Sequence, residues 1–120
     1  MTDDELTYRV AEEVMGWRCE VDLIDGVTSW WVDDDDEWHG DTTAWSPLTN
    51  DVLMNEVLAK WADRVTRLYG NGTGWTACVS PATGCPDRMA DSDGLTMQSL
   101  KRAILLAMLE ACSCNKEVTR

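Results

Sequence analysis

TMQSLKRAILLAMLEA, residues 96–111, is the stretch whose pattern decides the fold. Its apolar residues recur every three or four positions from Met97 to Ala111, while polar residues such as Lys101 lie on the opposite side. A pattern of this period predicts a helix that buries one face against the rest of the chain. Thr96 is a suitable N-cap. We therefore predict a C-terminal helix, with residues 112–120 as a frayed tail.

A helix and a hairpin are predicted at the N-terminus. Residues 2–5 match the Thr-x-x-Glu capping box, and apolar residues at helical spacing follow, which predicts a helix over residues 3–15. Polar and apolar residues alternate over residues 18–24, as in a half-buried strand. Asp25-Gly26 then predicts a two-residue turn into a return strand over residues 27–32.

The same helix-then-hairpin order is predicted a second time. Thr49 or Asn50 can cap an amphipathic helix that should end near Arg64. Residues 66–69 and 75–80 are strand-like and flank a glycine-rich turn, which predicts a second hairpin.

Two segments without periodicity, residues 33–47 and 81–94, are expected to be long loops because they contain prolines and glycines. The predicted order of elements is therefore α-β-β-α-β-β-α. Two hairpins with one apolar face each are marginal alone, so we expect them to join. The sequence thus predicts an α+β fold over residues 1–120, a single domain in which one antiparallel four-stranded sheet packs with three helices.

The charge of the chain is concentrated near its N-terminus. The 120 residues carry a net charge of −12, and residues 1–41 hold fourteen acidic residues against two arginines. This field disfavours direct binding to nucleic acid or to anionic membranes and favours a basic partner. No apolar run has the length of a membrane span, and Met1 and Thr2 are followed by three acidic residues rather than a secretion signal. We expect a cytoplasmic protein whose five cysteines form no disulfide framework.

Three stretches resemble one known family. They are Glu5–Trp17 (ELTYRVAEEVMGW), Trp45–Asp51 (WSPLTND) and Ala90–Ala111 (ADSDGLTMQSLKRAILLAMLEA). Together they resemble the phage ABA sandwich domain of phage and prophage proteins, over nearly the whole chain. The resemblance implies a small layered domain of helices and a sheet, encoded by a phage or prophage. It brings no established catalytic activity and no active-site residues. The chain departs from the family pattern in the acidic residues 33–37 and in the stretch 81–94.

The residues form no pattern typical of an active site or a metal centre. Every candidate catalytic triad would depend on the single histidine, His39, which lies among acidic residues. Residues 33–37 lack the spacing and the closing glutamate of a calcium loop, and the cysteines do not have zinc-site spacing. We therefore expect no enzymatic activity, no metal and no cofactor.

Tryptophans and carboxylates coincide between residues 30 and 45. Tryptophan is a rigid anchor at interface hot spots, and carboxylates steer a basic partner. We expect this segment to bind and inhibit a host protein, such as the nucleic-acid-binding surface of a defence protein, by imitating phosphate charge. The alternative left open is that the tryptophans fill the core and the acids form a solvated rim. Exposed aromatic side chains would also permit a homodimer. The predicted binding residues are Trp30, Trp31, Asp33, Asp34, Asp35, Asp36, Glu37, Trp38, His39, Asp41 and Trp45.

A second hypothesis is a small-molecule binder that sequesters a nucleotide between helix and sheet. Tyr69 and Trp75 would line its pocket together with the loop 81–94, and Arg67 and Arg88 would contact the anion. A third hypothesis is a structural or assembly component of the virion.

Overall fold

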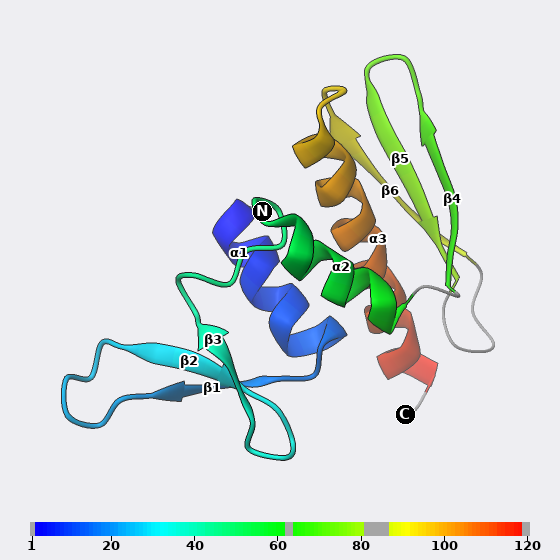
Figure 1. The fold of residues 1–120 in the computed structure, drawn as a ribbon. Helices are drawn as coiled ribbons and strands as arrows, with labels where there is room; N and C mark the ends of the chain where they lie inside the picture. Colours follow the sequence, from blue (N-terminus) through cyan, green and yellow to red (C-terminus); the bar gives the residue numbers. More distant parts are fainter. Residues whose placement is uncertain (1, 62–63, 81–86, 119–120) are drawn as a thin grey trace.

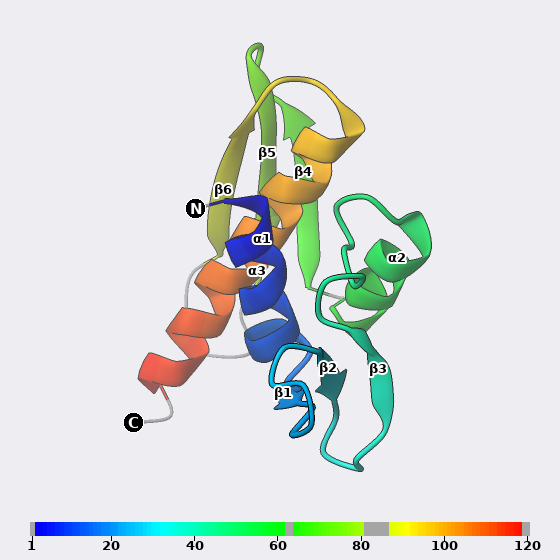
Figure 2. The same ribbon diagram turned by 90° about the vertical axis from the view of Figure 1, so that its left-hand side faces the viewer.

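The structure is a computed structural model that describes residues 2–61, 64–80 and 87–118 (Figures 1 and 2). Its helices and strands form an α+β fold, which confirms the predicted fold class. In chain order the elements are α1 (Asp3–Arg9), the π-helical turn η1 (Val10–Val14), β1 (Arg18–Val21), β2 (Ser29–Val32), β3 (Trp38–Asp41), α2 (Asp51–Lys60), β4 (Val65–Gly70), β5 (Gly74–Val79), β6 (Arg88–Asp93) and α3 (Met97–Val118).

The first helix begins where the capping box predicts. The side chain of Thr2 accepts a hydrogen bond from the backbone N–H of Glu5 at 3.2 Å. α1 continues directly into η1, and Gly16 follows with a φ of +75°, a conformation that favours glycine. The helix predicted over residues 3–15 is therefore confirmed, although its second half is a π turn that the pattern did not predict.

The first hairpin has a wider connection than predicted. β1 and β2 pair antiparallel, with Cys19 opposite Trp31. They are joined by the loop 22–28, so the prediction of a two-residue turn at Asp25-Gly26 is wrong. The carboxylate of Asp25 accepts the backbone N–H groups of Val27 and Thr28, and these bonds close a longer loop instead.

Each segment expected to be a loop contributes a strand. β3, within residues 33–47, pairs with β2, and β6, within residues 81–94, pairs with β5. Residues 81–86 lie outside the described residues. The prediction of one four-stranded sheet is therefore wrong, because the strands form two three-stranded antiparallel sheets, β1-β2-β3 and β4-β5-β6. The second strand of each hairpin, β2 or β5, pairs with the strand that follows it in sequence, β3 or β6. The two hairpins therefore do not pair with each other.

The second hairpin, β4-β5, forms as predicted. Gly74, the first residue of β5, lies so close to β6 that only glycine fits there. The side chain of Asn71 accepts the backbone N–H groups of Thr73 and Gly74 and so shapes the turn. A Cβ atom on Gly74 would lie 1.9 Å from the carbonyl oxygen of Ser92. Any larger residue at position 74 would therefore push β6 away from β5.

α2 begins at the expected cap and ends early. The side chain of Asn50 accepts the N–H groups of Val52 at 3.0 Å and of Leu53 at 3.4 Å. The helix ends at Lys60 rather than near Arg64, because Trp61 leaves the helical conformation with a φ of −128°. The indole of Trp61 is buried in the core.

α3 lies at the centre of the molecule. It packs on β5 and β6 with one side and on α1 and η1 with another (Figures 1 and 2). Ala103, Leu105 and Met108 on this helix are completely buried. α3 continues to Val118, so the frayed tail predicted over residues 112–120 is wrong as far as residue 118. Cys112 is buried, and its thiol donates a hydrogen bond to the carbonyl of Glu13 in η1.

Two methionines on α3 give a matched test of this packing. Met108 has 0% and Met97 has 65% of its surface exposed. We expect Met108→Ala to lower the free energy of unfolding by about 2–5 kcal/mol, because it leaves a cavity in the core. Met97→Ala should change it by less than about 0.5 kcal/mol. Urea unfolding followed by circular dichroism measures both, and equal losses would contradict the assigned orientation of α3.

Candidate protein-binding surface on the N-terminal sheet

The segment predicted to bind a partner, residues 30–45, forms most of β2, the turn that follows it, β3 and the residues just after β3 (Figure 1). We call residues 33–37, between the two strands, the acidic loop. The side chains of Asp34, Asp35, Asp36 and Glu37 are exposed. The structure thus presents four of the five predicted acidic-loop residues to solvent as one local cluster of negative charge.

The tryptophans of the segment do not share one environment. Trp31 is 1% exposed and Trp45 is 3% exposed, so both lie in the core. Their predicted role in partner binding is therefore wrong, since neither can reach a partner. Trp30 is half-buried, and Trp38 is 68% exposed beside the acidic loop. The sequence could not make this distinction, because strand alternation gives opposite faces to neighbours without saying which face is covered.

The buried tryptophans attach β1-β2-β3, which we call the N-terminal sheet, to the helices. The ring of Trp31 lies 4.8 Å from that of Tyr8 on α1, measured between centroids. Trp17, just after η1, meets Trp45 edge-on at 5.2 Å and stacks on the ring of His39 at 4.3 Å. Trp17 was not among the predicted site residues, although it ends the first stretch of the family resemblance. Its contact with β3 arises only from the tertiary fold.

Asp33 organises the acidic loop rather than presenting its charge. One carboxylate oxygen accepts the backbone N–H groups of Asp35 at 2.8 Å and of Glu37 at 3.0 Å. The other lies 2.7 Å from Nε2 of His39. The hydrogen bond from His39 and then those from the backbone hold the pKa of Asp33 below its usual range, because they favour the charged form.

Arg18 on β1 also holds the acidic loop in place. Its guanidinium donates to the backbone carbonyl of Asp33 at 3.0 Å and to the carboxylate of Asp36. A further bond to Glu20, the largest contribution, and the pairing with Asp36 raise the pKa of Arg18. Asp36 has a φ of +63°, which is uncommon for a residue with a side chain. These contacts give the loop a defined shape before any partner is present.

A cleft of about 540 Å³ lies beside the acidic loop. The loop and His39 form one wall, and Glu56 and Lys60 on α2 form part of the other. Of the charged residues that line the cleft, only Lys60 carries a fixed positive charge, so carboxylates dominate the space. The cleft is therefore suited to a cationic group rather than an anion.

Among the described residues, Asp33, Glu37 and His39 form the group that could hold a metal ion. Their candidate ligand atoms lie within 4.8 Å of one another. Both oxygens of Asp33 already accept hydrogen bonds from the loop and from His39, so an ion would have to compete with the contacts that shape the loop. His39 also stacks flat on Trp17, and both contacts favour a structural role for this ring over general base catalysis.

The residues predicted to hold a nucleotide are not brought together. Arg67 is opposite Cys78 and Tyr69 is opposite Thr76, whereas Arg88 is opposite Val79. Successive residues of a strand point to opposite faces, so Arg67 and Tyr69 lie on one face of the sheet and Trp75 and Arg88 on the other. The predicted pocket is therefore wrong as a single site.

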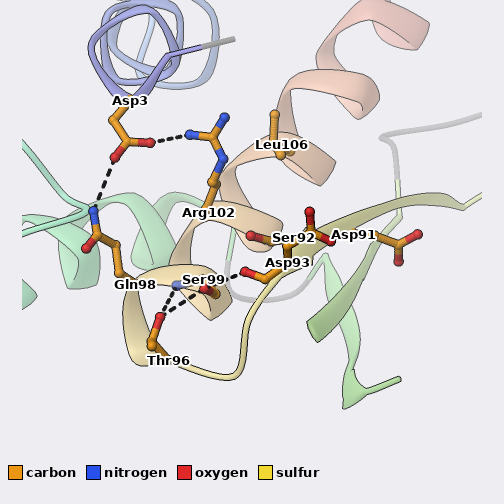
Figure 3. Close-up of a pocket in the computed structure, with 9 residues that line it drawn as sticks. All are labelled: Asp3, Asp91, Ser92, Asp93, Thr96, Gln98, Ser99, Arg102 and Leu106. Carbon is orange, nitrogen blue, oxygen red and sulfur yellow. Dashed lines mark hydrogen bonds and ion pairs between the residues drawn. The ribbon is translucent and has the colours of Figure 1, made fainter. Parts of the chain in front are cut away.

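A different pocket lies where α1, the end of β6 and the first turns of α3 meet (Figure 3). It encloses about 440 Å³ and is lined by Asp3, Asp91, Asp93 and Arg102, among other residues. Arg102 pairs with Asp3 across the pocket, as the dashed line in Figure 3 shows. Three carboxylates against one guanidinium make this pocket a poor receptor for a phosphate group.

The hydrogen bonds of Asp33 predict an acid-dependent contribution to stability. A carboxylate whose pKa is lower in the folded chain stabilises the fold above its unfolded pKa, near 3.8, and loses this effect as the pH falls through the folded pKa. We expect Asp33→Asn to destabilise the protein at pH 6, and the difference from wild type to shrink below about pH 4.

Urea unfolding midpoints measured between about pH 2 and pH 6 test this expectation, with Asp34→Asn as the control because Asp34 is exposed on the same loop. A difference between Asp33→Asn and wild type that is the same at every pH would contradict it.

No protein-family model matches the chain, no curated protein matches it, and no solved structure matches it. Among the described residues, none of the helices combines the length and the apolar character of a membrane span. The resemblance to the phage ABA sandwich domain stays a prediction.

Proposed function

We propose that this chain is a small accessory protein, of phage origin as the family resemblance implies, that binds and inhibits a host protein. The acidic loop and the exposed indole of Trp38 would form the contact, and the partner would present a basic surface. The observation that carries the proposal is the position of Trp38, 68% exposed, next to four exposed carboxylates. Tryptophan is enriched at interface hot spots, and carboxylates beside it would steer a basic partner.

The charge distribution supports a basic partner. Fourteen of the 22 acidic residues lie in residues 1–41, and this part of the chain includes the acidic loop. Such a field raises the rate of encounter with a positively charged protein and repels anionic ones. A surface that normally binds nucleic acid is the basic surface most suited to it, because its lysines and arginines are spaced for an array of phosphates. The chain itself would then not bind nucleic acid.

The rigidity of the acidic loop supports the same role. Asp33, His39 and Arg18 already hold the loop through seven hydrogen bonds. A loop with a fixed shape loses less conformational entropy on binding than a mobile one. This organisation also explains why Asp33 is unsuitable for testing the contact, since its substitution would change the shape of the loop together with its charge.

Charge reversal at Asp34 and Asp35 tests the role of the loop. We expect a tagged Asp34→Lys/Asp35→Lys protein to capture its partner from a host lysate much less well than wild type. With the purified partner, its dissociation constant should be about tenfold higher or more at low salt, because the steering charge has changed sign.

The control is Asp87→Lys/Glu110→Lys, which makes the same charge change at two exposed positions outside the N-terminal sheet. It should bind within about threefold of wild type. If both double variants weaken binding equally, only net charge matters and the proposed surface is not the binding site.

Trp38→Ala tests the anchor. We expect the dissociation constant to rise about tenfold or more. Added salt should alter this loss of affinity less than it alters the loss caused by Asp34→Lys/Asp35→Lys. The free energy of unfolding should stay within about 0.5 kcal/mol of wild type, since the indole is 68% exposed. Calorimetric titration and urea unfolding measure the two quantities, and unchanged affinity would remove Trp38 from the interface.

A further inference from the structure

The loop 22–28, which joins β1 to β2, carries an apolar tip that the described part of the chain leaves exposed. Leu23 is 98% exposed, Ile24 is 97% exposed and Val27 is 83% exposed. Figure 1 shows this loop at the end of the N-terminal sheet that points away from the helices. Single exposed aliphatic residues are common, but three within five residues at a projecting turn form an apolar patch, which typically marks an interaction site.

The tip has a fixed shape. The backbone N–H of Asp22 donates to the carbonyl of Thr28, and that of Gly26 donates to the carbonyl of Asp22, both at 2.8 Å. The carboxylate of Asp22 accepts the N–H of Ile24 at 2.8 Å. The carboxylate of Asp25 accepts the hydroxyl of Thr28 and then two backbone N–H groups, and these bonds lower the pKa of Asp25. The loop therefore holds its aliphatic side chains outward without help from the core.

The charges around the tip indicate what it would enter. The side chains of Asp22 and Asp25 belong to the same loop, and Glu20 precedes it on β1. Arg18, the basic residue of β1, bonds Glu20 and the acidic loop. A basic rim around an apolar floor complements an apolar tip flanked by carboxylates. An anionic lipid surface would instead repel these carboxylates, because membrane-inserting loops depend on nearby lysine and arginine.

The tip and the acidic loop lie at opposite ends of β2. This strand, Ser29–Val32, has four residues, so the two loops are separated by roughly 13 Å at about 3.3 Å per residue. A protein surface of ordinary size spans this distance easily. One partner can therefore reach both loops.

We propose that the loop 22–28 inserts Leu23 and Ile24 into an apolar, basic-rimmed pocket on the same protein that the acidic loop binds. This inference rests on the proposed function and adds a second contact to it. The acidic loop supplies steering and salt dependence, and the tip supplies apolar burial that salt does not screen. Loss of the tip should therefore act mainly on the rate of dissociation.

The test uses the double variant Leu23→Ser/Ile24→Ser of the full chain, with Val52→Ser/Leu95→Ser as its matched control. Val52 and Leu95 are 68% and 60% exposed, so the control removes two exposed aliphatic side chains elsewhere. Both variants should unfold at the temperature of the wild type. The probe is the protein that wild type captures from host lysate, purified and titrated against each variant.

We expect the dissociation constant of the tip variant to rise about tenfold or more with an unchanged salt dependence, and that of the control to stay within about twofold. A photo-reactive p-benzoyl-phenylalanine placed at position 24 should cross-link to an apolar segment of the partner that is bordered by lysine or arginine. Both results together support the inference.

Several results would overturn it. Unchanged affinity of the tip variant, while Asp34→Lys/Asp35→Lys still weakens binding, removes the inference and leaves the proposed function in place. Cross-linking of position 24 to a second copy of the chain shows that the tip mediates self-association instead. Sedimentation of wild type, but not the tip variant, with vesicles of phosphatidylcholine and phosphatidylglycerol shows a membrane contact. Failure of the wild type to capture any protein removes both proposals.

Discussion

The burial of α3 is the constraint on which the rest of the structure depends. This helix packs against β5 and β6 as well as α1 and η1, so it joins the two halves of the chain in one core. Met108 and Leu105, completely buried, lie at the centre of that core. Because the second sheet, β4-β5-β6, buries its apolar face on α3, it does not have to pack against the N-terminal sheet. That sheet is therefore free to project.

Three tryptophans then decide how the N-terminal sheet is attached. Trp17, Trp31 and Trp45 are buried between the sheet and the helices, at the cost of leaving the indole N–H groups of Trp31 and Trp45 without a hydrogen-bond partner among the described residues. Each unsatisfied group costs about 1–3 kcal/mol, which the burial of about 150–250 Å² per indole outweighs. The attachment uses one face of the sheet and leaves the loops at both ends of β2 in solvent. These loops carry the two contacts that we propose.

Local signals predicted the elements that depend on local chemistry. The caps at Thr2 and Asn50 and the turn at Asn71 are formed by side chains bonding to backbone groups within three residues, so their pattern is readable in the sequence. The strands β3 and β6 were missed because their residues have little intrinsic preference for a strand. They form because an existing hairpin offers an open edge beside them. The extension of α3 beyond residue 111 likewise depends on packing, since the thiol of Cys112 reaches η1.

The sequence by itself determined the fold class, the helix caps and the concentration of acidic residues near the N-terminus, because each depends on residue type and spacing alone. Only the tertiary structure decided which tryptophans are buried and which one is exposed, since neighbours on a strand face opposite sides and the core selects between them. It also decided that the nucleotide-binding set is split between two faces, and that the aliphatic residues of the loop 22–28 remain in water. Burial is a property of the whole chain, and for these side chains no local pattern could reveal it.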